Sequence, residues 1–313
     1  MRLSVLDQSP IAAGSTGGDA LRQSIDLAQH VDALGYHRYW IAEHHGTSML
    51  ACASPEVLIP SIAAATNRLR VGSGGVMLPH YSPLKVAETF SMLSGLFPGR
   101  IDLGLGRAPG SDPLTAFALQ RDRRQPPPDD FPDQLAELLG YLSGTRPRLP
   151  GHPERPGVWL LGSSPQSAVW AAELGLPYAF ADFINPAGAD IVARYRRECQ
   201  TPSVIVCGWA LCADTDEEAR RLSASARMAF AKLLQGQPIP VPPVDEALAF
   251  LAANGAAADA LVRRRRWIVG SPQTVRAGLE ALAQEYGADE VMVVTITCDH
   301  AARKRSYELI ADR

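Results

Sequence analysis

The chain has 313 residues, a formal net charge of -3, 46% hydrophobic residues and 20% charged residues. This balance is typical of a globular chain with a sizeable core, and it gives no general electrostatic reason to bind nucleic acid or a membrane. Five cysteines without C-x-x-C spacing argue against a disulfide framework and a structural zinc site. With no export signal and no apolar run of the roughly 18 residues that a membrane span needs, we expect a cytoplasmic protein that binds a small molecule.

Short β-rich runs alternate with helical stretches from the start of the chain. The expected strands here are Leu3–Leu6, Tyr39–Ala42, Leu69–Met77 and Ile101–Leu105. The expected helices are one that Asp19 caps and Gly35 ends, then Pro55–Ala65 and Pro83–Leu96. This alternation predicts parallel strands covered by helices.

The same alternation resumes after an interruption. Its expected strands are Val158–Leu161, Tyr178–Ala181, Val204–Leu211 and Glu290–Thr297. Its expected helices are Gln166–Leu174, Ala187–Glu198, one from about Asp214, a second helical block, and a terminal helix from Ala301. Eight strand–helix units favour a closed α/β barrel over an open sheet, so we predict a (β/α)8 TIM barrel formed by residues 1–313 as a single domain.

Two proline-containing insertions interrupt this rhythm, after the fourth and the seventh expected strands. The first, Ser111–Gly157, contains Pro126–Pro128 and a modest helix near Asp130–Leu142, and the second is Gln235–Arg266. Barrels carry their active sites on the connections that follow strands, so each insertion is a candidate lid or substrate wall. A bland linker is the alternative for both.

Three ionisable side chains, Glu43, His44 and His45, come just after the second expected strand. An imidazole there could give or take a proton near neutral pH. Two adjacent histidines are also common as surface or hydrogen-bonded structural residues. Metal binding together with His80 is a further alternative, although no H-x-H or H-E-x-x-H spacing supports it.

Glycines and an arginine mark the ends of the third and fourth expected strands. The glycines within Val71–Pro79 would let a planar ligand approach the backbone, but a β-bulge or tight packing explains them equally well. The segment Asp102–Gly110 resembles a dinucleotide fingerprint only superficially, because Pro109 and Gly110 suit a loop and not a helix start. What remains is Arg107, placed to form a forked pair with a phosphate.

A serine-rich segment, Leu160–Ser167, precedes an expected helix and offers hydroxyls and backbone N–H groups to an anion. Helix capping would explain it as well. Two features suited to phosphate after neighbouring strands nevertheless favour a shared anion. A third basic stretch, Arg263–Arg266, is interpreted as a solvated helix end in preference to a ligand site.

Together these segments resemble the luciferase-like flavin monooxygenase family over nearly the whole chain. The most specific parts, in the family's order and at its spacing, are Trp40–His45, Gly72–Pro79, Pro98–Gly110 and Leu160–Pro177. The resemblance implies a barrel with long insertions, FMN at the carboxyl ends of the strands, and a homodimer formed through barrel helices.

The resemblance also implies roles for single residues. His44 would be the acid–base residue beside the flavin, with His45 as a second candidate. Gly74–Gly75 would lie against the flavin ring at an unusual or cis peptide bond, and Arg107 would bind the FMN phosphate. The full set of implied cofactor-binding residues is Gly74, Gly75, Val76, Gly106, Arg107, Ser163, Ser164 and Ser167.

Two departures from the family pattern point to its non-bioluminescent branch. Light-emitting members carry a cysteine where this chain has Gly106, and a tryptophan where it has Asp182. A carboxylate at Asp182 would suit either a polar substrate or the capping of the next segment.

The leading hypothesis is a monooxygenase that uses reduced FMN and O2 on a small organic substrate and receives its flavin from a separate NAD(P)H-dependent reductase. This chemistry belongs to the flavin and needs no protein metal. A deazaflavin-dependent oxidoreductase is a variant on the same fold. The alternatives from other classes are a flavin-binding protein without turnover and a metal-dependent hydrolase using His44, His45 and His80.

Overall fold

The structure is a computed structural model that describes residues 1–107, 112–125, 129–146, 153–262 and 265–312. Its strands are β1 (Arg2–Asp7), β2 (Arg38–Ile41), β3 (Arg70–Met77), β4 (Ile101–Gly106), β5 (Gly157–Gly162), β6 (Tyr178–Ala181), β7 (Val204–Cys212), β8 (Trp267–Gly270) and β9 (Glu290–Val294). Parallel pairing runs from β1 through β7 in order, and β9 joins β7 to β1. These eight strands form a closed barrel, so the predicted (β/α)8 TIM barrel is confirmed.

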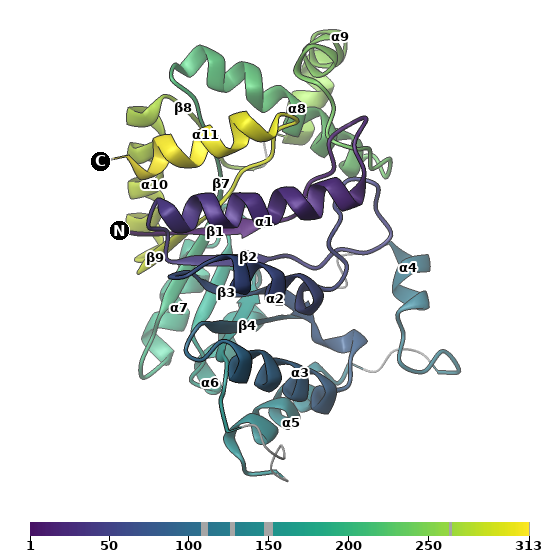
Figure 1. Cartoon of the computed structure of the whole chain (residues 1–313), viewed down its shortest axis with the longest axis vertical. Coiled ribbons are helices and arrows are strands. Elements are labelled where there is room, and N and C mark those ends of the chain that lie inside the picture. The colour runs from purple at the N-terminus through teal and green to yellow at the C-terminus, as the bar shows by residue number, and fades with distance from the viewer. Residues whose placement is uncertain (108–111, 126–128, 147–152, 263–264, 313) are drawn as a thin grey trace.

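Helices surround the barrel (Figure 1). They are α1 (Gly17–Ala33), α2 (Pro55–Ala65), α3 (Pro83–Leu96), α4 (Pro113–Ala118), α5 (Phe131–Ser143), α6 (Pro165–Glu173), α7 (Ala189–Glu198), α8 (Asp216–Leu234), α9 (Val244–Val262), α10 (Pro272–Tyr286) and α11 (His300–Ala311). Both chain ends lie on the left of Figure 1, beside the amino ends of the strands, whereas α4 projects on the right. The part of the insertion after β4 that contains α4 therefore extends on the side of the carboxyl ends, whereas α5 lies beside α3.

One further strand, β8, was not predicted. It pairs with Trp209–Cys212 of β7, whereas β9 pairs with Ile205–Trp209 of the same strand. The closed ring of eight strands therefore does not pass through β8. This strand has four residues and directly follows a run of arginines in the sequence, so it is too short to show the alternating hydrophobic pattern of a strand.

The start of α1 corrects one predicted helix boundary. Thr16, and not Asp19, is the N-cap: its hydroxyl accepts from the Asp19 backbone N–H at 3.1 Å. The Asp19 carboxylate in turn accepts from the Thr16 backbone N–H at 3.0 Å, which completes a capping box. Asp19 was mistaken for the cap because Asp is favoured both at the cap and in the first turn.

The last two elements also differ from the prediction. The last strand was expected to reach Thr297, but β9 ends at Val294. The terminal helix begins at His300, one residue earlier than expected, with Asp299 as its N-cap. Thr295 leaves the ladder and donates its hydroxyl to the Ala210 carbonyl at 2.8 Å, which satisfies this acceptor without another strand residue.

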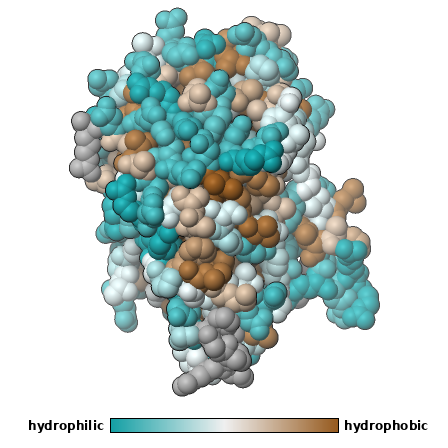
Figure 2. Space-filling view, viewed as in Figure 1, coloured by the Kyte–Doolittle hydropathy of each residue, from teal (hydrophilic) through white to brown (hydrophobic). Residues whose placement is uncertain are grey.

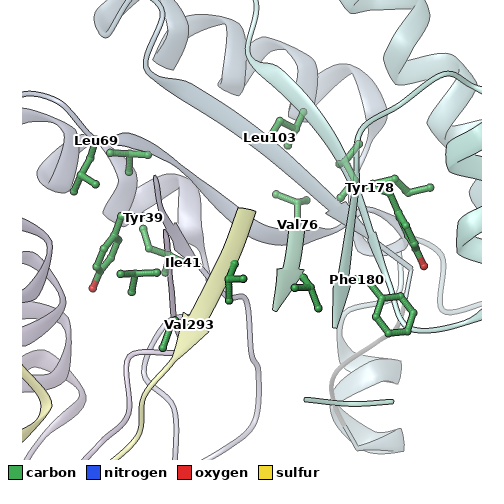
Figure 3. Packing of buried hydrophobic residues seen from close by; sticks show 14 of the residues in the cluster. Tyr39, Ile41, Leu69, Val76, Leu103, Tyr178, Phe180 and Val293 are labelled. Carbon is green, nitrogen blue, oxygen red and sulfur yellow. The ribbon is translucent and has the colours of Figure 1, made fainter. Parts of the chain in front are cut away.

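Two hydrophobic layers hold the barrel together. Alternate strand residues point outward against the helices, as Tyr39, Ile41 and Phe180 do in Figure 3. The residues between them point inward, and Trp40 and Ile205 belong to this inner cluster. The two clusters follow the alternation of side chains along each strand.

Buried ion pairs close the amino-terminal end of the barrel. Arg38 pairs with Asp102 at 2.5 Å and with Glu290 at 3.1 Å. Arg70 pairs with the other oxygen of Asp102 at 2.6 Å. The Trp40 indole N–H also donates to Asp102, at 3.0 Å. Because charged groups fill this end, the ligand chemistry predicted from the sequence belongs to the opposite end.

The backbones of β3 and β4 approach closely at Gly104, which leads to a stability prediction. A Cβ atom there would overlap the Ser73 carbonyl oxygen and lie 2.9 Å from Leu161 Cδ1. We expect Gly104→Ala to lower the free energy of unfolding by about 1–3 kcal/mol, as other overpacked sites do. Gly106→Ala is the matched control in the same strand, because a Cβ there meets no atom of the described residues within 4 Å. Urea denaturation of both variants tests this, and equal stabilities would contradict it.

Candidate active site

The predicted site residues meet at the carboxyl ends of four neighbouring strands. His44 and His45 follow β2, Gly74–Val76 lie in β3, Gly106 and Arg107 end β4, and Ser163–Ser167 follow β5. These four strands pair in that order. The structure therefore places all of these residues on one edge of the barrel, as expected from their positions after strands.

Glu43 organises the histidine segment, a role that the sequence analysis did not assign. Its carboxylate is buried and accepts hydrogen bonds from the Tyr81 hydroxyl at 2.8 Å and from the Met77 backbone N–H at 3.0 Å. The same carboxylate pairs with His45 Nε2 at 2.7 Å. Glu43 thus connects the end of β2 to the segment after β3 and fixes the His45 ring. Its position beside two histidines at a strand end was the available signal.

His44 lies in a different environment from His45. Its backbone N–H donates to the Cys52 carbonyl at 2.9 Å, whereas its Nδ1 atom is buried without a hydrogen-bond partner among the described residues. Burial, with a smaller effect of the neighbouring His45, lowers the pKa of His44 to about 4. The imidazole is therefore neutral at pH 7.

The glycines of β3 show both a β-bulge and tight packing, the two explanations that the sequence left open. The Gly74–Gly75 peptide bond is cis, and the pairing of β3 with β4 shifts register between Ser73 and Val76. A Cβ atom at Gly75 would lie 2.6 Å from the Gly104 carbonyl oxygen. Tight packing therefore explains glycine at this position, and the bulge exposes backbone at the strand end.

Arg107 extends from the end of β4 toward α6. Its guanidinium lies 5.5 Å from the ring centroid of Trp170, and it is 3.9 Å from the Asp129 carboxylate. The Arg107 side chain is about half exposed. Because its carboxylate partner among the described residues is as far as 3.9 Å away and the side chain is accessible, the Arg107 guanidinium can bind an anion. The residues Pro109 and Gly110 of the same motif lie outside the described residues.

The serine segment caps α6, as the alternative interpretation held. Ser164 is the N-cap, and its hydroxyl accepts from the Ser167 backbone N–H at 3.4 Å. The Ser167 hydroxyl bonds to the Tyr178 hydroxyl at 2.8 Å. The Ser163 carbonyl accepts from the Asn185 amide at 2.9 Å. Capping does not occupy every donor at a helix start, so anion binding remains compatible with it.

Both insertions reach the loop after β2. A Cβ atom at Gly46 would overlap Thr115 of α4, so this helix packs against the residue that follows His45. The Ser48 hydroxyl donates to the Pro238 carbonyl in the second insertion at 2.9 Å. Parts of both insertions thus lie beside the histidine segment, whereas Pro126–Pro128 lie outside the described residues.

The comparisons with known proteins decide the family. A family model described as luciferase-like monooxygenase matches residues 1–290. The chain belongs to the luciferase-like monooxygenase family. It is 41% identical to an Escherichia coli (strain K12) luciferase-like monooxygenase, covering 99% of this chain and 96% of that protein. It is 36% identical to the N-acetyl-S-alkylcysteine monooxygenase of Bacillus subtilis (strain 168), covering 100% of this chain and 98% of that protein.

Solved structures agree with this family assignment. The crystal structure of apo-MsnO8 has a TM-score of 0.90 and 42% identity, covering 99% of this chain and 97% of that one. At 21% identity and a TM-score of 0.74, the oxygenating constituent of 3,6-diketocamphane monooxygenase from Pseudomonas putida was solved with FMN; the match covers 100% of this chain and 97% of that one. An F420-dependent secondary alcohol dehydrogenase, at 14% identity and a TM-score of 0.73, covers 100% of this chain and 99% of that one. These last two show the shared fold alone.

In this member of the luciferase-like monooxygenase family, Asp182 has a different structural role from helix capping. It does not cap the next helix, because the N-cap of α7 is Gly188. Its buried carboxylate accepts from the Tyr286 hydroxyl at 2.9 Å and lies 3.4 Å from Arg266 Nε. Burial raises the pKa of Asp182. Of the two alternatives left open for Asp182, helix capping is not observed, because partners on α10 and before β8 determine the orientation of this side chain.

The histidines do not form a metal site within the part of the chain that the structure describes. The rings of His45 and His80 lie 6.4 Å apart, and no three His, Cys, Asp or Glu side chains of the described residues group around a common point. All five cysteines are free thiols. Among the described helices, none is both long and apolar enough to span a bilayer.

Proposed function

We propose that the chain is an FMN-dependent monooxygenase that oxidises a small organic substrate with O2. A separate NAD(P)H-dependent reductase would supply the reduced flavin. The observation that carries this proposal is the meeting, on one barrel edge, of a neutral His44 with an unpartnered Nδ1, a glycine-lined strand end and the available Arg107. The named monooxygenases among the relatives support the reaction class.

The residues at this edge fit FMN. The partly exposed Gly74 and Gly75, followed by the buried Val76, would contact the flavin ring, and the open space at Gly106 among the described residues leaves room beside it. Arg107 would bind the phosphate together with Ser163 and Ser164 at the start of α6. Ser167 would act through the cap that it forms with Ser164, because its hydroxyl is bonded to Tyr178.

The bound flavin would supply the redox chemistry, and the chain's own residues would manage protons and exclude water. His44, whose imidazole is partly exposed and neutral at pH 7, would exchange a proton with the bound flavin or substrate. Glu43 would hold His45 beside it. The two insertions, which contact the loop after β2, would form the wall that limits water entry.

A deazaflavin is the second candidate cofactor, supported by the F420-dependent dehydrogenase of the same fold. FMN is preferred because the relatives at 41% and 36% identity are named monooxygenases. The two are separated by anaerobic titration with reduced FMN and with reduced F420, followed by mixing with oxygenated buffer. Saturable FMN binding with oxygen-dependent reoxidation is expected, whereas binding of F420 alone would replace FMN in the proposal.

The phosphate role of Arg107 gives a sharper test. We expect Arg107→Ala to weaken binding of reduced FMN by about 10- to 100-fold, because a charge-assisted hydrogen bond is lost. Binding of reduced riboflavin, which lacks the phosphate, should not change. Arg124→Ala is the matched control, since Arg124 is exposed and pairs only with Asp122 among the described carboxylates. Equal loss of FMN and riboflavin affinity would remove Arg107 from the phosphate site.

A homodimer through barrel helices is also part of the proposal. Exposed apolar side chains on α2 and α3 support it, because Val57 is 72% exposed, Met92 52% and Leu96 67%. Figure 2 shows hydrophobic residues gathered over the middle of this face, where Figure 1 places these helices. The single domain and the cytoplasmic location stay predictions.

A further inference from the structure

Two adjacent arginines of the basic stretch have different partners. Arg266 pairs with Glu285 at 2.6 Å and lies 3.4 Å from Asp182. Arg265 donates to the Phe183 carbonyl, and no carboxylate of the described residues lies within ion-pair distance of it. Arg265 is nevertheless partly buried, and burial lowers its pKa. A partly buried cation without an anionic partner is costly, and the described residues supply no such partner to Arg265, so this guanidinium is suited to a ligand.

Contacts place Arg265 on the same barrel edge as the proposed flavin site. Its acceptor, Phe183, directly follows the end of β6, and the Phe183 backbone N–H donates to the Cys207 carbonyl at 3.2 Å. Two residues further on, Asn185 donates to the Ser163 carbonyl of the serine segment at 2.9 Å. The loop after β6 therefore contacts Arg265 on one side and the proposed phosphate segment on the other.

Aromatic rings lie next to this guanidinium. Arg265 Cζ is 4.4 Å from the centroid of Phe230 in α8. The Phe230 ring contacts Trp209 at a centroid distance of 5.3 Å, and Trp209 contacts Trp267 at 4.2 Å. Phe183 and Trp267 are partly buried against the inner cluster of the barrel. Because Phe230 and Trp209 are buried, the aromatic surface left beside this charge is that of Phe183 and Trp267. A charge next to apolar surface is the combination that recognises an organic anion.

We propose that Arg265 binds the carboxylate of the substrate, and that the adjacent aromatic side chains contact its apolar part. The substrate class is then small organic acids, an inference that rests on the proposed monooxygenase function. The planar fork of a guanidinium matches two carboxylate oxygens. A flavin phosphate could also pair with a guanidinium. In the proposed function, however, Arg107 and the start of α6 already bind that phosphate, and a phosphate would make no use of the aromatic rings beside Arg265.

The test compares carboxylates with their uncharged amides. The full-length protein is titrated calorimetrically with three pairs: benzoate and benzamide, phenylacetate and phenylacetamide, N-acetyl-S-benzylcysteine and its carboxamide. Wild type is expected to prefer the acid by about 10- to 100-fold in at least one pair, the size of one hydrogen bond to a charged group. Arg265→Gln should abolish the preference, and Arg265→Lys should keep part of it, because Lys retains the charge without the fork.

Arg220→Gln is the matched control, since Arg220 is an exposed residue of α8, 3.9 Å from Asp216, and it should keep the full preference. Should Arg265→Gln fail to fold, an Arg265→Lys variant that binds acids as tightly as wild type would still overturn the role of the fork. The proposal is also overturned if wild type prefers the acid in no pair, or if Arg265→Gln retains the preference.

Parallel titrations with reduced FMN and reduced riboflavin separate this inference from the proposed function. Loss of FMN affinity alone in Arg265→Gln would make Arg265 a phosphate residue and refute the substrate role. Absence of flavin binding in wild type, with acid preference intact, would refute the proposed function and leave the carboxylate site in place.

Discussion

Replacing His44 with alanine is expected to lower oxygen-dependent turnover by about 10²–10⁴-fold, the usual contribution of a positioned acid–base group. The physical reason is that His44 is a neutral, partly exposed imidazole that no carboxylate of the described residues holds, whereas His45 pairs with Glu43. Affinity for reduced FMN should stay close to that of wild type. Turnover is measured on a substrate identified by screening, with a flavin reductase and NAD(P)H supplying reduced FMN.

His37→Ala is the control for this experiment. His37 immediately precedes β2 at the opposite end of the barrel and is 36% exposed, so its loss should not affect turnover. Catalysis at His44 is abandoned if His44→Ala binds reduced FMN normally and turns over like wild type. The pH profile adds a second readout: because the pKa of His44 is about 4, the free enzyme should show no inflection from this residue near the ordinary histidine value of 6.5.

Removing the guanidinium of Arg303 is expected to lower the free energy of unfolding by about 3–5 kcal/mol, because it leaves a buried charge without its partner. Arg303 of α11 is 2% exposed and pairs with Asp7, at the end of β1, at 2.6 Å. It also donates to the Thr295 carbonyl at 2.9 Å. Urea denaturation of Arg303→Met measures the effect.

Arg305→Met is the matched control on the same helix. Arg305 is 52% exposed and pairs with Asp214 at 2.9 Å, so its loss should cost less than about 1 kcal/mol. A change in Arg303→Met no larger than in Arg305→Met would contradict the prediction.

The same pair predicts how stability depends on pH. Burial opposes ionisation of Asp7, but Arg303 and hydrogen bonds to Asp7 outweigh it and hold the pKa below the ordinary value of 3.8. A carboxyl with a lowered folded-state pKa contributes stability above its unfolded-state pKa and loses it as pH falls through the folded value. Wild type should therefore lose stability below about pH 4 more steeply than an Asp7→Asn variant.

The hydrophobic pattern and the turn residues of the sequence predicted the eight barrel strands, because each strand has a run of apolar or β-branched residues bounded by turn residues. The strand β8 was not predicted, which shows the limit of reading strands from the sequence pattern. Its four residues follow Arg266 without a break, and its pairing depends on the edge that β7 offers beyond Trp209. Thr16 was passed over because the sequence cannot distinguish the cap from the third helical residue when both are polar.

The candidate site was predictable to the extent that it depends on position after strands. His44, Arg107 and Ser164 needed only strand order to come together. The partners of Asp182 and of the two arginines come from other elements: Tyr286 is 104 residues from Asp182, Phe183 is 82 residues from Arg265, and Glu285 is 19 residues from Arg266. No local pattern records which of two neighbouring arginines faces a carboxylate.

The pairing of β7 has a consequence for how such chains diversify. Its first half completes the ring with β9, and only its last residues hydrogen-bond to β8. An evolutionary exchange or lengthening of the excursion that carries Arg265 would therefore leave every hydrogen bond of the eight-strand ring in place. With Arg265 in its proposed role, a change confined to this excursion would alter the substrate site and leave the folding of the barrel unchanged.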